Sequence, residues 1–151
     1  MTEIFKVHLA TRERVVDLLN KHSDAELNHI VEGFSNNLIW NAAHILVTQH
    51  LLTYARCNKD IPLNTAIVEA YRKGSKPEST CTSTDIALIK DLLIASHETF
   101  KRDFEQGYFT GFQHYITSYG VPLDTIEDAV VFNNTHEGLH LGYMMAMRKK
   151  L

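Results

Sequence analysis

The residues best suited to chemistry in this chain are a pair of histidines, His136 and His140, and a single histidine, His44, inside an apolar run. Two histidines four positions apart lie one turn apart on the same face of a helix, so both imidazoles can bind one metal ion. If His44 reaches the same point from another helix, three imidazoles would hold the ion and leave coordination positions open. That arrangement is typical of a catalytic metal centre rather than a structural one.

The four-residue spacing alone is weak evidence, because the chain has 9 histidines among 151 residues. Chance placement gives roughly half of one such pair. The surrounding sequence carries more weight, since all three histidines fall on stripes that step by three and four residues and should face a partner helix. On one helix the stripe contains Asn37, Trp40, His44, Val47, Leu51 and Tyr54, and on the other it contains Ile126, Ala129, Asn133, His136, His140, Tyr143 and Met147.

A buried imidazole without a partner costs a few kcal/mol, so each of these histidines needs one. One shared metal ion would satisfy all three. The alternative is that each forms a hydrogen bond with an ordinary neighbour such as Asn133, Asn37 or Tyr143. His8 could line the interior of its own helix, and it is the reserve candidate for a fourth ligand or a substrate contact.

Four stretches with helical periodicity must position these residues, over about 2–22, 38–57, 85–106 and 125–151. A long connector, 58–84, holds Pro62 and a Gly-Ser-Lys-Pro break, with a short helix expected over 64–73. Thr125 and Asp128 resemble a capping box at the start of the last helix. The aromatic-rich segment 109–119 could be a strand, but we interpret it as a lid over one end. The pattern predicts one all-α domain over 1–151, a four-helix bundle.

Composition narrows the function classes. The formal net charge of −3, with no basic stripe, argues against a nucleic-acid partner. The apolar runs are too short for a membrane span, and the N-terminus lacks the features of a secretory signal. Cys57 and Cys81 form no C-x-x-C pair, which predicts neither a disulfide framework nor a cysteine zinc site. We therefore expect a bacterial-type cytoplasm with reduced thiols.

Two known metal-binding motifs are matched only in part, because each lacks a ligand that it requires. The segment 136–140 matches H-E-x-x-H, in which Glu137 would be the base of a zinc protease, but 141–151 contains no Asp, Glu, His or Cys to supply a third ligand. A di-iron carboxylate bundle needs a carboxylate from the second helix, and no acidic residue stands between Glu32 and Asp60.

The segment Trp40-Asn41-Ala42-Ala43-His44-Ile45 resembles the W-x3-H-L/I segment of DinB-like (DNA-damage-inducible) proteins. The segment from His136 to His140 and on through Leu141-Gly142-Tyr143 resembles that family's closing H-x3-H-x-G-Q. The likeness covers essentially the whole chain. One departure is Tyr143, which stands where the family commonly has Gln and would border the metal cavity.

The resemblance implies an up-down-down-up four-helix bundle that binds a divalent ion through His44, His136 and His140. Zinc or nickel is typical of such proteins, and iron or manganese would also suit imidazole ligands. Some relatives are thiol S-transferases that use low-molecular-weight thiols, others are isomerases of thiol adducts, and homodimers are common.

We therefore expect a metal-dependent enzyme acting on a small molecule, either a thiol S-transferase or a hydrolase. Glu137 is a candidate base or hydrogen-bond acceptor near the metal, although a solvated surface carboxylate is the simpler interpretation. Asn37, Trp40 and Tyr143 are candidate substrate contacts. The alternatives are a non-catalytic metal- or ligand-binding module, and a plain bundle whose core histidines are hydrogen-bonded.

Overall fold

The structure is a computed structural model that describes residues 2–151. It is mostly helical, as expected for an all-α fold, and two short strands form the only sheet in the described range. The elements in chain order are α1 (Thr2–Leu19), α2 (Asp24–Asn28), α3 (Leu38–Leu52), the 3-10 turn η1 (Ala55–Cys57), α4 (Thr65–Tyr71), α5 (Ser83–Glu105), β1 (Tyr115–Ile116), β2 (Pro122–Leu123), α6 (Ile126–Met147) and the 3-10 turn η2 (Arg148–Lys150).

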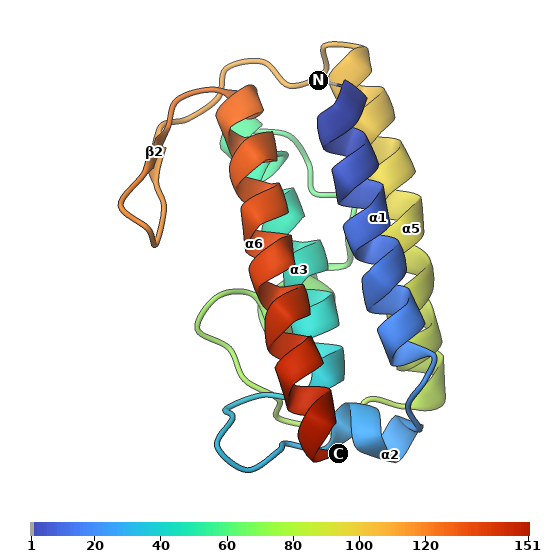
Figure 1. Cartoon of the computed structure of the whole chain (residues 1–151). Helices are drawn as coiled ribbons and strands as arrows, with labels where there is room; N and C mark the ends of the chain where they lie inside the picture. The colour runs from blue at the N-terminus through green and yellow to red at the C-terminus, as the bar shows by residue number, and fades with distance from the viewer. Residues whose placement is uncertain (1) are drawn as a thin grey trace.

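The four long helices, α1, α3, α5 and α6, lie side by side (Figure 1). Helices α1 and α3 each pack against both α5 and α6. The short α4 packs against α3, and α2 packs against α3 near its N-terminal end. Helix α3 is therefore enclosed by its neighbours, and all its residues except Thr48 and Leu51 are buried.

Side-chain caps define where the helices begin. The predicted capping box of α6 is confirmed: the Thr125 side chain accepts from the backbone N–H of Asp128, and the Asp128 side chain accepts from that of Thr125. Asn37 caps α3 by accepting from the backbone N–H of Trp40. Each cap satisfies a backbone donor that the first helical turn leaves unpaired.

Two helices end earlier than their apolar patterns predict. Helix α1 was expected to reach about His22 but ends at Leu19, because Ser23 takes an extended conformation to cap a short helix, α2, in a segment expected to be a polar link. Helix α3 was expected to reach about Cys57 but ends at Leu52. The chain there tightens into η1 and then turns at Asn58, whose φ of 52° is left-handed.

The aromatic segment before α6 forms a small hairpin rather than a continuous strand. β1 and β2 pair antiparallel, with Tyr115 opposite Leu123. Phe109 and Leu123 are buried in a cluster with Phe5 and Phe100, so this part of the segment does cover one end of the core. The hairpin itself stands beside α6 (Figure 1).

The core divides into two apolar clusters with a polar layer between them. One cluster includes Val15, Leu46 and Leu93, and the other includes Phe5 and Phe100. The buried polar layer takes at least one residue from each long helix at an intermediate position along it: His8, Arg12, Gln49, Ser96, His97, Asn133 and Glu137. None of the helices in residues 2–151 combines the length and hydrophobicity that crossing a membrane requires.

Candidate metal centre

The three histidines singled out from the sequence come together in the structure. His44 lies on α3, and His136 and His140 lie one turn apart on α6, which packs against α3. One ring nitrogen from each side chain lies within 4.8 Å of those from the other two. The ring centroids of His136 and His140 are 4.5 Å apart, and those of His44 and His140 are 4.8 Å apart.

The ring of His44 is held in one orientation by its neighbours. Its Nδ1 lies 2.7 Å from the backbone carbonyl oxygen of Tyr71 in α4. A carbonyl can only accept, so Nδ1 must carry the hydrogen and Nε2 keeps its lone pair. Trp40 stacks on the ring at a centroid distance of 4.6 Å, and the Thr48 hydroxyl lies 3.3 Å from Nε2. His44 therefore presents a fixed Nε2 donor atom.

A chain of asparagine contacts fixes His140 in the same way. The Asn41 side-chain nitrogen lies 2.8 Å from the backbone oxygen of Asn37, an acceptor only, which settles the orientation of the Asn41 amide. The Asn41 oxygen therefore faces Nδ1 of His140, at 2.8 Å, and accepts its hydrogen. The lone pair of His140 is left on Nε2. Such hydrogen bonds behind the ligands orient imidazoles in metal sites.

His136 differs from the other two histidines because one of its ring nitrogens has no hydrogen-bond partner among the described residues. That nitrogen is Nδ1, and it is buried. Most buried polar groups are paired, and leaving one unpaired is unfavourable by about 1–3 kcal/mol. The residues thus fit a metal ion on two grounds: the cluster supplies three imidazoles, and one of them has a buried nitrogen that no residue in 2–151 satisfies.

Burial keeps the three rings in the form that binds metal. Burial, with repulsion from His44, lowers the pKa of His136 to about 4. Burial, with repulsion from the other two histidines, lowers the pKa of His140 to about 3. Burial also lowers the pKa of His44, although the hydrogen bond to Tyr71 opposes that shift. All three imidazoles are neutral at pH 7, as metal coordination requires.

A cavity of about 350 Å³ opens beside the cluster and is lined by His44 and His136. Thr48 and Leu51, the two residues of α3 that are not buried, also line it. The walls include cationic and aromatic side chains from segments outside α3, among them Arg56, Lys73, Tyr115 and Phe132, but no Asp or Glu. The histidines are thus reachable by a small molecule.

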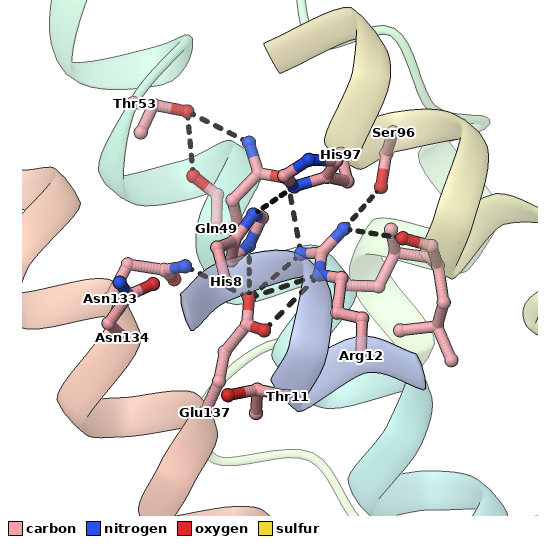
Figure 2. A network of polar contacts seen from close by, with 12 residues as sticks. His8, Thr11, Arg12, Gln49, Thr53, Ser96, His97, Asn133, Asn134 and Glu137 are labelled. Atoms are coloured by element: carbon pink, nitrogen blue, oxygen red, sulfur yellow. Dashed lines mark hydrogen bonds and ion pairs between the residues drawn. The ribbon is translucent and has the colours of Figure 1, made fainter. Parts of the chain in front are cut away.

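Glu137 lies in the polar layer of the core, and its interpretation as a solvated surface carboxylate is wrong (Figure 2). Its side chain is 0% exposed and its Oε1 lies 2.8 Å from the Arg12 guanidinium. Asn133 donates to the same carboxylate at 2.9 Å. Burial alone would raise the pKa of Glu137, but Arg12 and His8 beside it hold that pKa below its ordinary range. No sequence signal indicated this, because only the packing of α1 against α6 brings Arg12 to the carboxylate.

His8, the reserve ligand, belongs to this polar layer and not to the cluster of His44, His136 and His140. Its Nε2 lies 3.0 Å from Glu137, and since a carboxylate only accepts, Nε2 carries the hydrogen. Burial lowers the pKa of His8, so the ring is neutral and its Nδ1 accepts from His97 at 2.7 Å. Both ring nitrogens of His8 are therefore occupied within the core (Figure 2).

None of the three candidate substrate contacts, Asn37, Trp40 and Tyr143, lines the cavity beside the histidines. The Asn37 side chain caps α3 and also donates to the backbone oxygen of Asn28 at 2.9 Å. Asn37 and Trp40 line a separate cavity of about 210 Å³. Tyr143 is 39% exposed and packs edge-on against Phe34. The next residue on α6, Met144, is fully buried.

Sequence reasoning missed two groups that support the cluster. Asn41 stands three residues before His44 in an otherwise apolar helix. The sequence therefore indicates a buried amide that requires a hydrogen-bond partner. The backbone oxygen of Tyr71 carried no signal, because only the path of the connector brings α4 against α3.

A search of curated protein sequences found no match. The model of the DinB superfamily matches residues 8–144, a range that includes His44, His136 and His140. Since this match spans well over half of the 151 residues, the chain belongs to the DinB superfamily.

Proposed function

We propose that this protein binds one divalent metal ion through His44, His136 and His140. The observation that carries the proposal is the convergence of the three rings, with Nδ1 of His44 and of His140 each committed to an acceptor. Those two hydrogen bonds leave the Nε2 lone pair of each ring free to coordinate an ion. The unpartnered Nδ1 of His136 adds a group that gains from coordination or from a rearrangement around an ion. Zinc or nickel is the expected ion, because neutral imidazoles suit both.

Cobalt(II) offers a direct test of this donor set, because its visible absorption reports the number and type of its ligands. Adding cobalt to metal-depleted protein should give a saturable spectrum at one equivalent per chain. The His140→Ala variant should lose that spectrum, whereas His22→Ala, on a histidine outside the cluster, should keep it. An identical spectrum in wild type and His140→Ala would exclude the proposed site.

We further propose that the site is catalytic and acts on a small molecule in the cavity. A divalent ion held by three neutral ligands keeps its full charge, so it would lower the pKa of a bound thiol or water. The chain's residues would hold the ion, shield it through Trp40 and α4, and admit the substrate along the Thr48 and Leu51 side of α3. A thiol would lose its proton to solvent, and its sulfur would attack an electrophilic carbon, forming a C–S bond while the bond to the leaving group breaks and that group departs with the bonding electron pair.

The composition of the cavity favours thiol chemistry over hydrolysis. Apart from the histidines, no side chain that lines the cavity is a ready proton acceptor at pH 7, and Glu137 is bound to Arg12 inside the core. A thiol needs little help from a base once its pKa is lowered, whereas attack by water usually uses one. The test is consumption of an electrophilic alkyl or aryl halide with and without a small thiol, and with and without a chelator.

A non-catalytic binding module is the second candidate, and the same absence of a base in the cavity supports it. Metal binding without thiol-dependent turnover across a panel of thiols and electrophiles would favour the module. Turnover that a chelator abolishes and zinc or nickel restores would favour the enzyme.

The order of helix directions in the bundle and the oligomeric state are also proposals. In Figure 1, α1 and α6 run in one direction and α3 and α5 in the other, which supports the up-down-down-up topology of DinB-like bundles. The expectation of a homodimer rests on the family resemblance. Sedimentation at micromolar concentration should give twice the mass of one chain, and a monomer there would remove that expectation.

A further inference from the structure

The cavity beside the histidines is strongly unbalanced in charge. Arg56 and Lys73 line it, and no acidic side chain does. Neither cation forms an ion pair with a carboxylate anywhere in residues 2–151, whereas the neighbouring Arg72 pairs with Glu69 at 2.7 Å. The cavity therefore carries the two positive charges of Arg56 and Lys73 with no carboxylate in its lining to balance them, and a bound divalent ion would add two more.

Arg56 is held in place without using its hydrogen-bond donors. Its guanidinium carbon lies 4.2 Å from the centre of the Tyr115 ring, a stacking distance. Its backbone oxygen accepts from the backbone N–H of Gln113 at 2.7 Å, which ties η1 to the segment leading into β1. The Arg56 guanidinium donates no hydrogen bond within residues 2–151. A guanidinium that is positioned but unpaired offers its planar pair of donors to a carboxylate.

The position of Arg56 also sets the length of a ligand. Leu52 ends α3 eight residues after His44, which corresponds to roughly 12 Å along the helix axis. Arg56 lies beyond that end, so the cavity reaches along one side of α3 from His44 and His136 to the Arg56 guanidinium. Between the two, the wall is apolar, with Leu51, Leu52 and Phe132.

We propose that the cavity binds a small organic carboxylate, with its anionic group on Arg56, its apolar body against Leu51, Leu52 and Phe132, and its other end toward His44 and His136. Lys73 adds positive charge to the same cavity. The assignment of the second end to the reacting position rests on the proposed metal site. Binding of the carboxylate to Arg56 does not depend on it.

The test compares 4-phenylbutyrate with its uncharged amide, using isothermal titration calorimetry on the full chain with and without zinc. The carboxylate should bind at least tenfold more tightly than the amide, in both metal states. Rising salt should weaken binding of the carboxylate and leave that of the amide nearly unchanged. Equal binding of acid and amide to wild type would overturn the proposal.

Arg56→Met should remove the preference for the carboxylate while leaving zinc content and thermal unfolding unchanged. Lys59→Met is the matched control, because Lys59 also stacks on an aromatic ring, that of Tyr108 at 4.8 Å, but does not line the cavity. A preference that survives Arg56→Met, or that vanishes only with zinc removal, would mean that the metal holds the carboxylate, and would overturn the proposal. Failure of the metal site itself would appear separately, as absence of zinc in wild type.

Discussion

His140 donates its Nδ1 hydrogen to the side-chain oxygen of Asn41 on the facing helix, across 2.8 Å. This one contact links the cluster of His44, His136 and His140 to the packing of α3 against α6. The Asn41 nitrogen is in turn occupied by the oxygens of Asn36 and Asn37, both at 2.8 Å. The amide therefore cannot rotate to present its nitrogen to His140 without breaking two hydrogen bonds.

Replacing Asn41 should weaken metal binding without removing a ligand. In Asn41→Leu, a change of similar size, His140 loses the acceptor that fixes its ring, and zinc affinity should fall roughly 10- to 100-fold. Competition with a chromophoric chelator measures the affinity, and circular dichroism checks the fold. Asn36→Ala, which leaves the Asn41 oxygen in place, should change affinity much less. Wild-type affinity in a folded Asn41→Leu would contradict this role.

Glu137 should matter for stability because it neutralises Arg12 inside the core. Both side chains are 0% exposed, so Glu137→Gln would leave a buried guanidinium without its counter-charge. Breaking a buried ion pair in this way lowers the free energy of unfolding by about 3–5 kcal/mol. Urea unfolding measures this loss.

The double variant Arg12→Met with Glu137→Leu separates charge from packing. Removing both partners leaves no unpaired charge, so the double variant should lose less stability than the two single changes summed. A loss below about 1 kcal/mol in Glu137→Gln alone would show that the ion pair is not what holds this layer together.

Acid should destabilise the protein partly through His50. Burial lowers the pKa of His50 to about 4, although its hydrogen bond to the Leu46 backbone oxygen opposes the shift. The unfolded chain, with a pKa near 6.5, binds this proton more readily than the folded one. The contribution is therefore fully present above pH 6.5 and is lost as the pH falls toward 4, by about 3 kcal/mol in all.

Measuring urea unfolding at several pH values between 4 and 7 tests this prediction. The pH dependence should be smaller in His50→Gln, which has no proton to gain, than in wild type. His29→Gln is the control, because the His29 side chain is exposed and has no hydrogen bond or ion pair within residues 2–151. An equal pH dependence in wild type and His50→Gln would show that His50 does not titrate in this window.

The main helices and the candidate histidines could be predicted from the sequence, because both depend on local patterns. Periodic apolar residues and caps such as Thr125 with Asp128 determine helices over short distances, and His136 and His140 share a face by spacing alone. His44 could be paired with them only by assuming that its stripe faced α6. That assumption held because α3 is packed on nearly every side.

The buried polar layer could not be predicted from the sequence, because it depends on how the helices are aligned. Glu137 and Arg12 look like surface residues by type, and only the alignment of α1 with α6 buries one against the other. The stripe predicted for α6 is buried at Ile126, Ala129, Asn133 and Met147, but the buried face also includes Glu137 and Met144, whereas Tyr143 is exposed. The cations of the cavity were missed likewise, because Arg56 and Lys73 come from separate turns whose paths the sequence does not specify.

Metal content per chain, measured by elemental analysis of untagged protein in wild type and His44→Ala, tests the central claim most directly. We predict close to one divalent ion per chain in wild type and little in His44→Ala, with His50→Ala retaining the wild-type content. No metal in wild type after incubation with zinc or nickel, or equal metal in wild type and His44→Ala, would contradict the three-histidine site.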